Sequence, residues 1–387
     1  MNYDKLALAS HKKHNGKLEV RSLVSIKDKK DLSIAYTPGV AAVCRAIAAD
    51  KEKARTLTLK GRTVLVVTDG SAILGLGNLG PEAALPVMEG KALLFKEFAG
   101  VDAFPIALAT QDTEEIITAI KMIAPAFGGV NLEDISAPRC FVVEERLKKE
   151  LNIPVMHDDQ HGTAIVVLAA LLNALRVVDK KIGSVRVVVN GAGAAGMAVT
   201  HLLMKAGVSG KNIIMLDSVG TLFVGRPGMN IYKDVIAKRT NPRHIHGGLG
   251  EALRGADVFI GTSVAGALRS EWVAYMAPRS IVFAMANPDP EISFEDAQKT
   301  GIAVFGTGRS DYPNQINNVL AFPGIFRGAL DAEARHITDG MKLAAAYAIA
   351  KLVSRSELSA SHIIPAPFDP RVAATVARSV RRAAKTA

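Results

Sequence analysis

The chain has 387 residues, more than one hydrophobic core usually supports, so we expect two domains. Hydrophobic residues make up 49% of it, but the long apolar stretch 164–172 is far shorter than the roughly 20 residues of a membrane-spanning helix. The net charge of +10 comes from scattered basic residues and one carboxy-terminal cluster with helical spacing, which is typical of a solvated helix face. We therefore expect neither a membrane nor a nucleic-acid partner.

The amino terminus has basic residues but no apolar segment with a small-residue cleavage site, which predicts a cytoplasmic protein. Its two cysteines, Cys44 and Cys140, are too few for a disulfide framework and lack CxxC spacing. We interpret both as buried or inert thiols.

Alternating strand-like and helix-like segments predict an α/β fold with two domains, residues 1–160 and 161–387. A helix is expected at 114–123, after the capping sequence TQDTEE. In the first domain, strands are predicted at 63–67, 103–108 and 154–156. After a helix that ends near residue 177, the second domain has predicted strands at 185–189, 212–216, 258–261, 281–285 and 303–305. This succession is typical of a doubly wound Rossmann-type sheet, and helices are predicted to follow at 338–353 and 370–384.

The sequence GAGAAG matches a dinucleotide-binding fingerprint. It directly follows the apolar segment VRVVV and opens a helix-like segment, so the backbone N–H groups at the helix start would bind a pyrophosphate. Asp217 ends the next strand about 20 positions later, where a ribose-binding carboxylate is expected. The alternative is a tight turn without a ligand. The predicted cofactor site consists of Gly191, Ala192, Gly193, Ala194, Ala195, Gly196 and Asp217.

A second match, GLGNLG, contains Gly75, Gly77 and Gly80. The sequence TDGSAIL separates it from its strand, and Pro81 follows it directly. We do not assign a dinucleotide to this match, which is either a plain turn or an active-site loop.

Two acidic pairs lie near apolar strands: Glu133 with Asp134, and Asp158 with Asp159. Adjacent carboxylates repel each other and resist desolvation, so a bound cation or a lysine would stabilise them. All-oxygen ligands favour Mg²⁺ or Mn²⁺ over zinc. The alternative is that these pairs are exposed loop charges.

His157 and His161 flank the second pair at the i and i+4 positions, a spacing that could bind zinc on a helix. The sequence PVMHDDQHG instead favours a strand followed by a turn. We therefore favour a polar, hydrogen-bonded role for both histidines.

A series of motifs stands in the order found in the short bacterial malic enzymes: LSIAYTPGVA, VVTDGSAILGLGNLG, MEGKALLF, GGVNLEDISAPRCF, VMHDDQHGTA, NGAGAAG, ANPDPE and GRSDYPNQINNVLAFPGIFRGAL. The chain resembles this family over nearly its whole length. The resemblance implies a substrate domain followed by a Rossmann-type domain with carboxy-terminal helices. It also implies a homodimer or higher homo-oligomer that oxidises malate with NAD or NADP and decarboxylates the product to pyruvate.

The same resemblance implies residue roles. Lys91 would be the general base, Asp158 would orient it, and Tyr36 would be the acid that protonates C3 of the enolate. Asn287 and Asn318 would contact the substrate, with Asn287 also near the cofactor. A divalent Mg²⁺ or Mn²⁺ would be held by Glu133, Asp134 and Asp159.

The chain departs from the longer, eukaryotic type at Ala72, where that type carries a substrate-binding arginine. The group that neutralises the second malate carboxylate is therefore not assigned. Asp217 favours NAD because a carboxylate repels a 2′-phosphate, whereas Ser218 and Arg226 could accommodate NADP. We prefer NAD modestly.

Two alternatives remain open. On the same scaffold, a malolactic enzyme or an oxaloacetate decarboxylase would show no net reduction of the cofactor. A dinucleotide sensor would bind without turnover, which is disfavoured because the base, the acid and the three metal ligands are all present.

Overall fold

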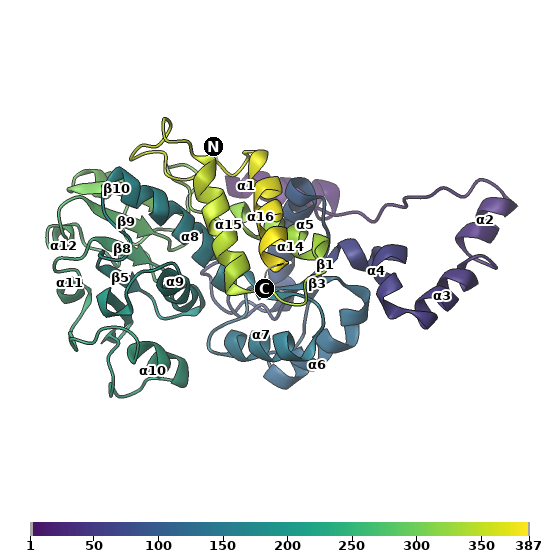
Figure 1. Cartoon of the computed structure of the whole chain (residues 1–387), viewed down its shortest axis with the longest axis horizontal. Coiled ribbons are helices and arrows are strands. Elements are labelled where there is room, and N and C mark those ends of the chain that lie inside the picture. Colours follow the sequence, from purple (N-terminus) through teal and green to yellow (C-terminus); the bar gives the residue numbers. More distant parts are fainter. Residues whose placement is uncertain (1–2, 386–387) are drawn as a thin grey trace.

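The computed structural model describes residues 3–385, and its first domain is built on a four-stranded parallel sheet (Figure 1). The order is β2-β1-β3-β4, and the strands are β1 (Thr63–Thr68), β2 (Asp102–Ala107), β3 (Gly129–Leu132) and β4 (Val155–His157). Every residue of β1 is buried, as expected for a central strand covered on both faces. The three strands predicted in this domain are confirmed, whereas β3 was not predicted.

The second domain contains a six-stranded sheet of order β10-β9-β8-β5-β6-β7, parallel except for β7. Its strands are β5 (Val187–Asn190), β6 (Ile213–Asp217), β7 (Gly220–Thr221), β8 (Val258–Gly261), β9 (Ser280–Ala284) and β10 (Ile302–Thr307). Sheet order reverses beside β5, as in a doubly wound fold. The predicted Rossmann-type α/β fold is confirmed.

Helices of the first domain are α5 (Pro81–Ala99), α6 (Thr113–Ile123) and α7 (Arg139–Glu150), with the short η3 (Ala124–Ala126). The predicted cap of α6 is present, because the Asp112 carboxylate accepts hydrogen bonds from the backbone N–H groups of Glu114 and Glu115. Helices of the second domain are α9 (Ala194–Lys205), α10 (Ile231–Ala237), α11 (Leu249–Ala252), α12 (Ser270–Val273) and α13 (Phe294–Gln298), with η4 (Gly210–Asn212).

Helix α8 (Asp158–Val177) joins the two domains. It begins directly after β4, so the turn expected in PVMHDDQHG is wrong: the segment passes from strand straight into helix. Two acidic residues, Asp158 and Asp159, occupy its first turn, where the helix dipole favours negative charge. The predicted domain boundary near residue 160 lies within this helix and stays a prediction.

Two helical stretches are long and apolar enough to cross a membrane by length and composition alone, Lys29–Ala49 and Asp158–Val177. The second is α8, 72% of whose apolar window is buried within the protein, as in the core helix of a soluble protein. The first is interrupted between Ala35 and Val40, so it is two short helices rather than one.

Those two helices belong to an arm, residues 18–62, that projects from the body (Figure 1). It contains α2 (Lys29–Ala35), α3 (Val40–Ala49), η1 (Lys51–Lys53), α4 (Ala54–Leu57) and η2 (Leu59–Arg62), and α1 (Tyr3–His14) precedes it. Every residue of the arm is exposed or half-buried, including many apolar ones. The sequence did not predict these helices.

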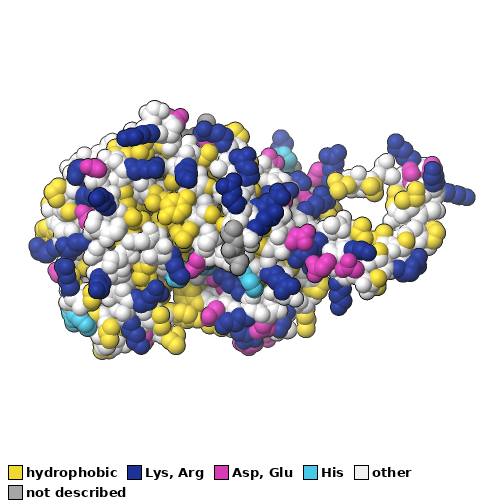
Figure 2. Space-filling model, viewed as in Figure 1, with side chains coloured by type: hydrophobic (Ala, Val, Ile, Leu, Met, Phe, Trp, Pro, Cys, Tyr) yellow, Lys and Arg dark blue, Asp and Glu magenta, His cyan; other side chains and the backbone are white. Residues whose placement is uncertain are grey.

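The carboxy-terminal helices are α14 (Phe322–Asp331), α15 (Asp339–Leu352) and α16 (Arg371–Ala384), preceded by η5 (Asn318–Leu320). The predictions at 338–353 and 370–384 are confirmed by α15 and α16. These helices return to the first domain, since α14 packs on α5 and α15 packs on α8 (Figure 1). Lysine and arginine side chains are scattered over this face, with one group over α16 (Figure 2).

Candidate active site

Three carboxylates meet at the carboxyl edge of the first sheet. Glu133 and Asp134 follow β3, and Asp159 lies in the first turn of α8. One oxygen atom from each lies within 4.8 Å of the others. Asp134 donates its backbone N–H to the Asp159 carboxylate at 2.8 Å, which ties the two segments together. The structure thus brings together the three residues expected to bind a metal.

Lys91 lies beside this cluster, on α5. Its Nζ is 2.7 Å from Oδ2 of Asp158 and 2.9 Å from Oε1 of Glu133. The Phe322 ring of α14 lies 4.3 Å from the same nitrogen, so the lysine is bounded on one side by an aromatic face. Lys91 is only 7% exposed, which marks it as a buried charge held by specific partners.

The cluster has more negative than positive charge. Burial, together with the neighbouring carboxylates of Asp159 and Glu133, raises the pKa of Asp134 to about 9. Burial likewise raises the pKa values of Asp158 and Asp159 to about 6, although Lys91 opposes it. For Lys91, burial lowers the pKa, but Asp158 and Glu133 outweigh this effect and raise it overall. One lysine cannot balance four carboxylates.

Two buried oxygens, Oδ2 of Asp134 and Oδ1 of Asp158, have no hydrogen-bond partner among the described residues. Unpartnered carboxylate oxygens in a crowded acidic cluster fit a bound divalent cation. The donor set consists of oxygen atoms, which suits Mg²⁺ or Mn²⁺.

The GAGAAG turn connects β5 to α9. A Cβ atom on Gly196 would lie 1.8 Å from the Gly191 carbonyl oxygen, so the turn requires glycine there. In contrast, a Cβ on Gly193 would meet nothing within 4 Å, which leaves open space at the start of α9. Ala194 also packs against the core of the first domain, so this turn faces the substrate domain. Such an open, glycine-lined helix start suits a pyrophosphate.

The two asparagines lie at the interface between the domains. Asn287 follows β9, and its carbonyl oxygen would be 2.2 Å from a Cβ on Gly75, so the GLGNLG loop packs against it. Asn318 lies at the start of η5, and its Cβ would be 3.0 Å from a Cβ on Gly162, one turn after Asp158. Both positions are compatible with a substrate held between the domains.

Tyr36 is not brought to this cluster. It is the residue that ends α2, it is 68% exposed, and it lies on the projecting arm (Figure 1). Within one chain, the expected acid is therefore separate from the expected base.

Comparison with known proteins decides the family. Residues 15–148 match the model of the malic enzyme N-terminal domain, and residues 160–385 match that of the malic enzyme NAD binding domain. The chain belongs to the malic enzyme family. It is 61% identical to the bifunctional malic/malolactic enzyme of Bacillus subtilis (strain 168), across 98% of this chain and 92% of that protein.

Other members of the malic enzyme family are also similar. The chain is 59% identical to the NAD-dependent malic enzyme of Geobacillus stearothermophilus, across 95% of this chain and 77% of that one. The crystal structure of the NAD-dependent malic enzyme of Thermotoga maritima matches with a TM-score of 0.93 and 49% identity, covering 97% of this chain and 98% of that one.

In this malic enzyme chain, the end of β6 differs from the simplest expectation. Asp217 lies there as predicted, but Arg226 donates to both of its oxygens and Lys233 lies 2.7 Å away. These contacts hold the pKa of Asp217 well below its usual range, although burial opposes them. The carboxylate is thus already paired with two cations. Sequence reasoning had noted Arg226 but missed Lys233.

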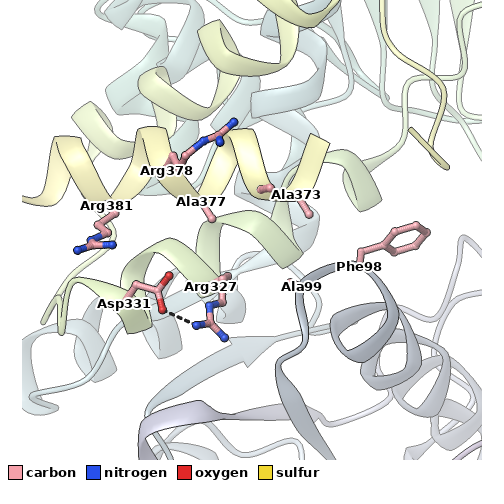
Figure 3. Close-up of a pocket in the computed structure, with 9 residues that line it drawn as sticks. Phe98, Ala99, Arg327, Asp331, Ala373, Ala377, Arg378 and Arg381 are labelled. Atoms are coloured by element: carbon pink, nitrogen blue, oxygen red, sulfur yellow. Dashed lines mark ion pairs between the residues drawn. The ribbon is translucent and has the colours of Figure 1, made fainter. Parts of the chain in front are cut away.

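A groove of about 300 Å³ lies elsewhere, between α5, α14 and α16 (Figure 3). Arg327 and Asp331 form an ion pair along it, and Arg381 lies nearby on α16. None of the predicted site residues lines this groove. It is therefore separate from the candidate active site.

Mn²⁺ should stabilise the folded protein. A ligand that binds only the folded state adds about 2.7 kcal/mol at a hundredfold excess over its Kd, which predicts a rise in Tm of roughly 5 to 10 °C for domains of this size. Calorimetry with Mn²⁺ or with EDTA measures the shift. Asp134→Ala should lose it, whereas Glu145→Ala, an exposed carboxylate on α7, should keep it. A wild-type Tm unaffected by millimolar Mn²⁺ would contradict the metal site.

Proposed function

We propose that this chain oxidises L-malate with NAD or NADP and decarboxylates the product to pyruvate and carbon dioxide, in the presence of Mg²⁺ or Mn²⁺. The observation that carries the proposal is the buried contact of Lys91 with Asp158 and Glu133, beside a three-carboxylate cluster at the interface with the dinucleotide domain. The names of its relatives, NAD-dependent malic enzyme among them, support the same reaction.

Each residue of the cluster has a proposed task. A divalent cation bound beside Lys91 would lower the pKa of its amine and favour the neutral form. In that form Lys91 accepts the proton of the malate C2 hydroxyl as hydride leaves C2 for the nicotinamide. Asp158 holds the Lys91 amine in place through the 2.7 Å hydrogen bond. A divalent ion held by Glu133, Asp134 and Asp159 supplies Lewis-acid polarisation of the substrate oxygen when bound. Asn287 and Asn318 orient the substrate carboxylates from the second domain.

The exposed position of Tyr36 on the arm supports a role for a second copy of the chain. In a single chain, apolar side chains of the arm are exposed to solvent, for example Ile34 at 65% and Leu23 at 75%. A symmetric exchange of arms between two copies would bury these side chains. It would also place Tyr36 of one copy near Lys91 of the other, where it would protonate C3 of the enolate. We therefore propose a homodimer with composite active sites.

A malolactic reaction is the second candidate, because the Bacillus subtilis relative is named a bifunctional malic/malolactic enzyme. The two reactions differ in their products. Malate oxidation yields pyruvate and reduced cofactor in equal amounts, whereas malolactic conversion yields lactate without net reduction. The cytoplasmic location expected from the sequence stays a prediction.

A malate assay with Mn²⁺ and NAD, measuring NADH, pyruvate and lactate, tests the reaction. We expect equimolar NADH and pyruvate from the wild type. Lys91→Ala should reduce kcat at least about 100-fold, because the base is lost, while NADH binding measured by fluorescence is retained. Lys96→Ala, an exposed lysine on the same helix, serves as the control. Lactate without NADH would refute the proposed reaction, and normal turnover by Lys91→Ala would exclude Lys91 as the base.

Mixing two inactive variants tests the composite site. Tyr36→Phe and Lys91→Ala should each be inactive alone. In a mixed dimer one site carries both substitutions and the other carries neither, so an equal mixture should recover about a quarter of the wild-type activity. Subunit exchange is verified by mass spectrometry with one variant isotopically labelled. Complete exchange without recovered activity would show that Tyr36 and Lys91 act within one chain or not at all.

For the cofactor, we propose that NAD is preferred and that NADP is also used. Asp217 is paired with Arg226 and Lys233, so the region that faces the adenosine ribose has a net positive charge. Lys233 is 23% exposed, enough to reach a 2′-phosphate, whereas Arg226 is buried at 7%. A lysine at this position offsets the repulsion between Asp217 and NADP.

Lys233→Met should therefore raise the KM for NADP about tenfold, because one charge-assisted hydrogen bond to the 2′-phosphate is lost. The KM for NAD should rise much less. Steady-state kinetics with both cofactors measure the ratio. Lys238→Met, which removes an exposed lysine at the end of the same helix, is the matched control. Equal changes for NAD and NADP would contradict the role of Lys233.

A further inference from the structure

A buried carboxylate lies directly behind the active-site segment. Glu144 is on α7 and is 5% exposed. It accepts a hydrogen bond from the backbone N–H of His157 at 3.1 Å and one from Nε2 of His161 at 3.0 Å. These two donors flank Asp158 and Asp159 in the chain. The Glu144 side chain thus holds both ends of segment 157–161. This segment contains Asp158, the partner of Lys91, and Asp159, one of the expected metal ligands.

A lysine from the far end of the chain completes this contact. Nζ of Lys342, on α15, lies 3.1 Å from Nδ1 of His161. An ammonium group can only donate, so Nδ1 is the acceptor and the ring proton lies on Nε2, which donates to Glu144. Lys342 thereby fixes the tautomer that the Glu144 contact requires. Lys342 is only 5% exposed, and the Asp339 carboxylate lies 3.6 Å from it.

Stability alone does not account for three polar groups in this place. Burying ionic groups costs desolvation free energy, and apolar residues of the same volume often give an equally stable core. Lys148 also contacts Glu144, at 2.6 Å, so the carboxylate has partners on several sides. What this arrangement specifically provides is a fixed direction for the first turn of α8.

We propose that Glu144, His161 and Lys342 are positioning residues that set the first turn of α8, and through it the orientation of Asp158 toward Lys91 and of Asp159 toward a divalent ion. This inference rests on the proposed function for its kinetic consequences, but its effect on metal binding does not require turnover. Partners that orient metal ligands are worth about 10- to 100-fold in metal affinity or activity.

The test compares substrate-free Mn²⁺ binding, followed by the electron paramagnetic resonance signal of free Mn²⁺, in wild type, Lys342→Met and Glu144→Gln. We expect both variants to bind Mn²⁺ about 10- to 100-fold more weakly, with kcat/KM for malate reduced in parallel. Their Kd for NADH should stay within about twofold, since the cofactor turn is untouched. Lys342→Arg, which keeps a donor at the same place, should restore much of the Mn²⁺ affinity.

Lys180→Met is the matched control, because it breaks a part-buried ion pair with Asp257 outside the active site. It should lower Tm without changing Mn²⁺ affinity. If Lys342→Met does not fold, Glu144→Gln and Lys342→Arg still give the comparison. Folded variants with wild-type Mn²⁺ affinity and kcat/KM would overturn the inference, as would an equal loss of affinity in Lys180→Met. A wild type that binds Mn²⁺ without oxidising malate would refute the proposed function alone.

Discussion

The repulsion among four carboxylates around one lysine is the constraint on which this active site depends. Glu133, Asp134, Asp158 and Asp159 come from two neighbouring strand ends, and Lys91 contacts only two of them. Parallel strands bring these ends to one edge of the sheet, and burial there raises the pKa values of the carboxyl groups. In the proposed function, a divalent cation held by Glu133, Asp134 and Asp159 would resolve this imbalance.

The carboxy-terminal helices α14 and α15 support this charge cluster. Phe322 of α14 packs edge-on against Phe95 of α5, with ring centroids 4.8 Å apart, and lies over the Lys91 amine. Lys342 of α15 reaches His161 at the start of α8. The carboxy-terminal helices therefore contribute to the candidate active site, although they follow the dinucleotide domain in the chain. Both domains and these helices must be folded together for the site to exist.

The arm explains why a single chain is not a complete enzyme in this proposal. Its apolar residues are exposed to solvent in a single chain. A short helix is marginally stable in water unless its apolar side packs against another surface. In the proposed dimer, the arm and Tyr36 would be covered by another copy of the chain. At the end of β6, Arg226 and Lys233 change the net charge around Asp217, the residue expected to face the cofactor.

Local patterns in the sequence determined most of the strands, helix α6, the glycine turn and the family, because apolar periodicity, capping residues and glycine spacing act over a few residues. They did not indicate the short strands β3 and β7. The family motifs also marked Lys91 and the three carboxylates expected to bind a metal. Tertiary structure alone decided which of these groups meet: His161 and Lys342 are 181 positions apart, and Lys233 approaches Asp217 only once α10 is docked. Family motifs marked Tyr36 as clearly as Lys91, yet within one chain Tyr36 lies outside the site. Contacts between distant segments depend on how the helices and strands pack, and not on the residues next to them in the sequence.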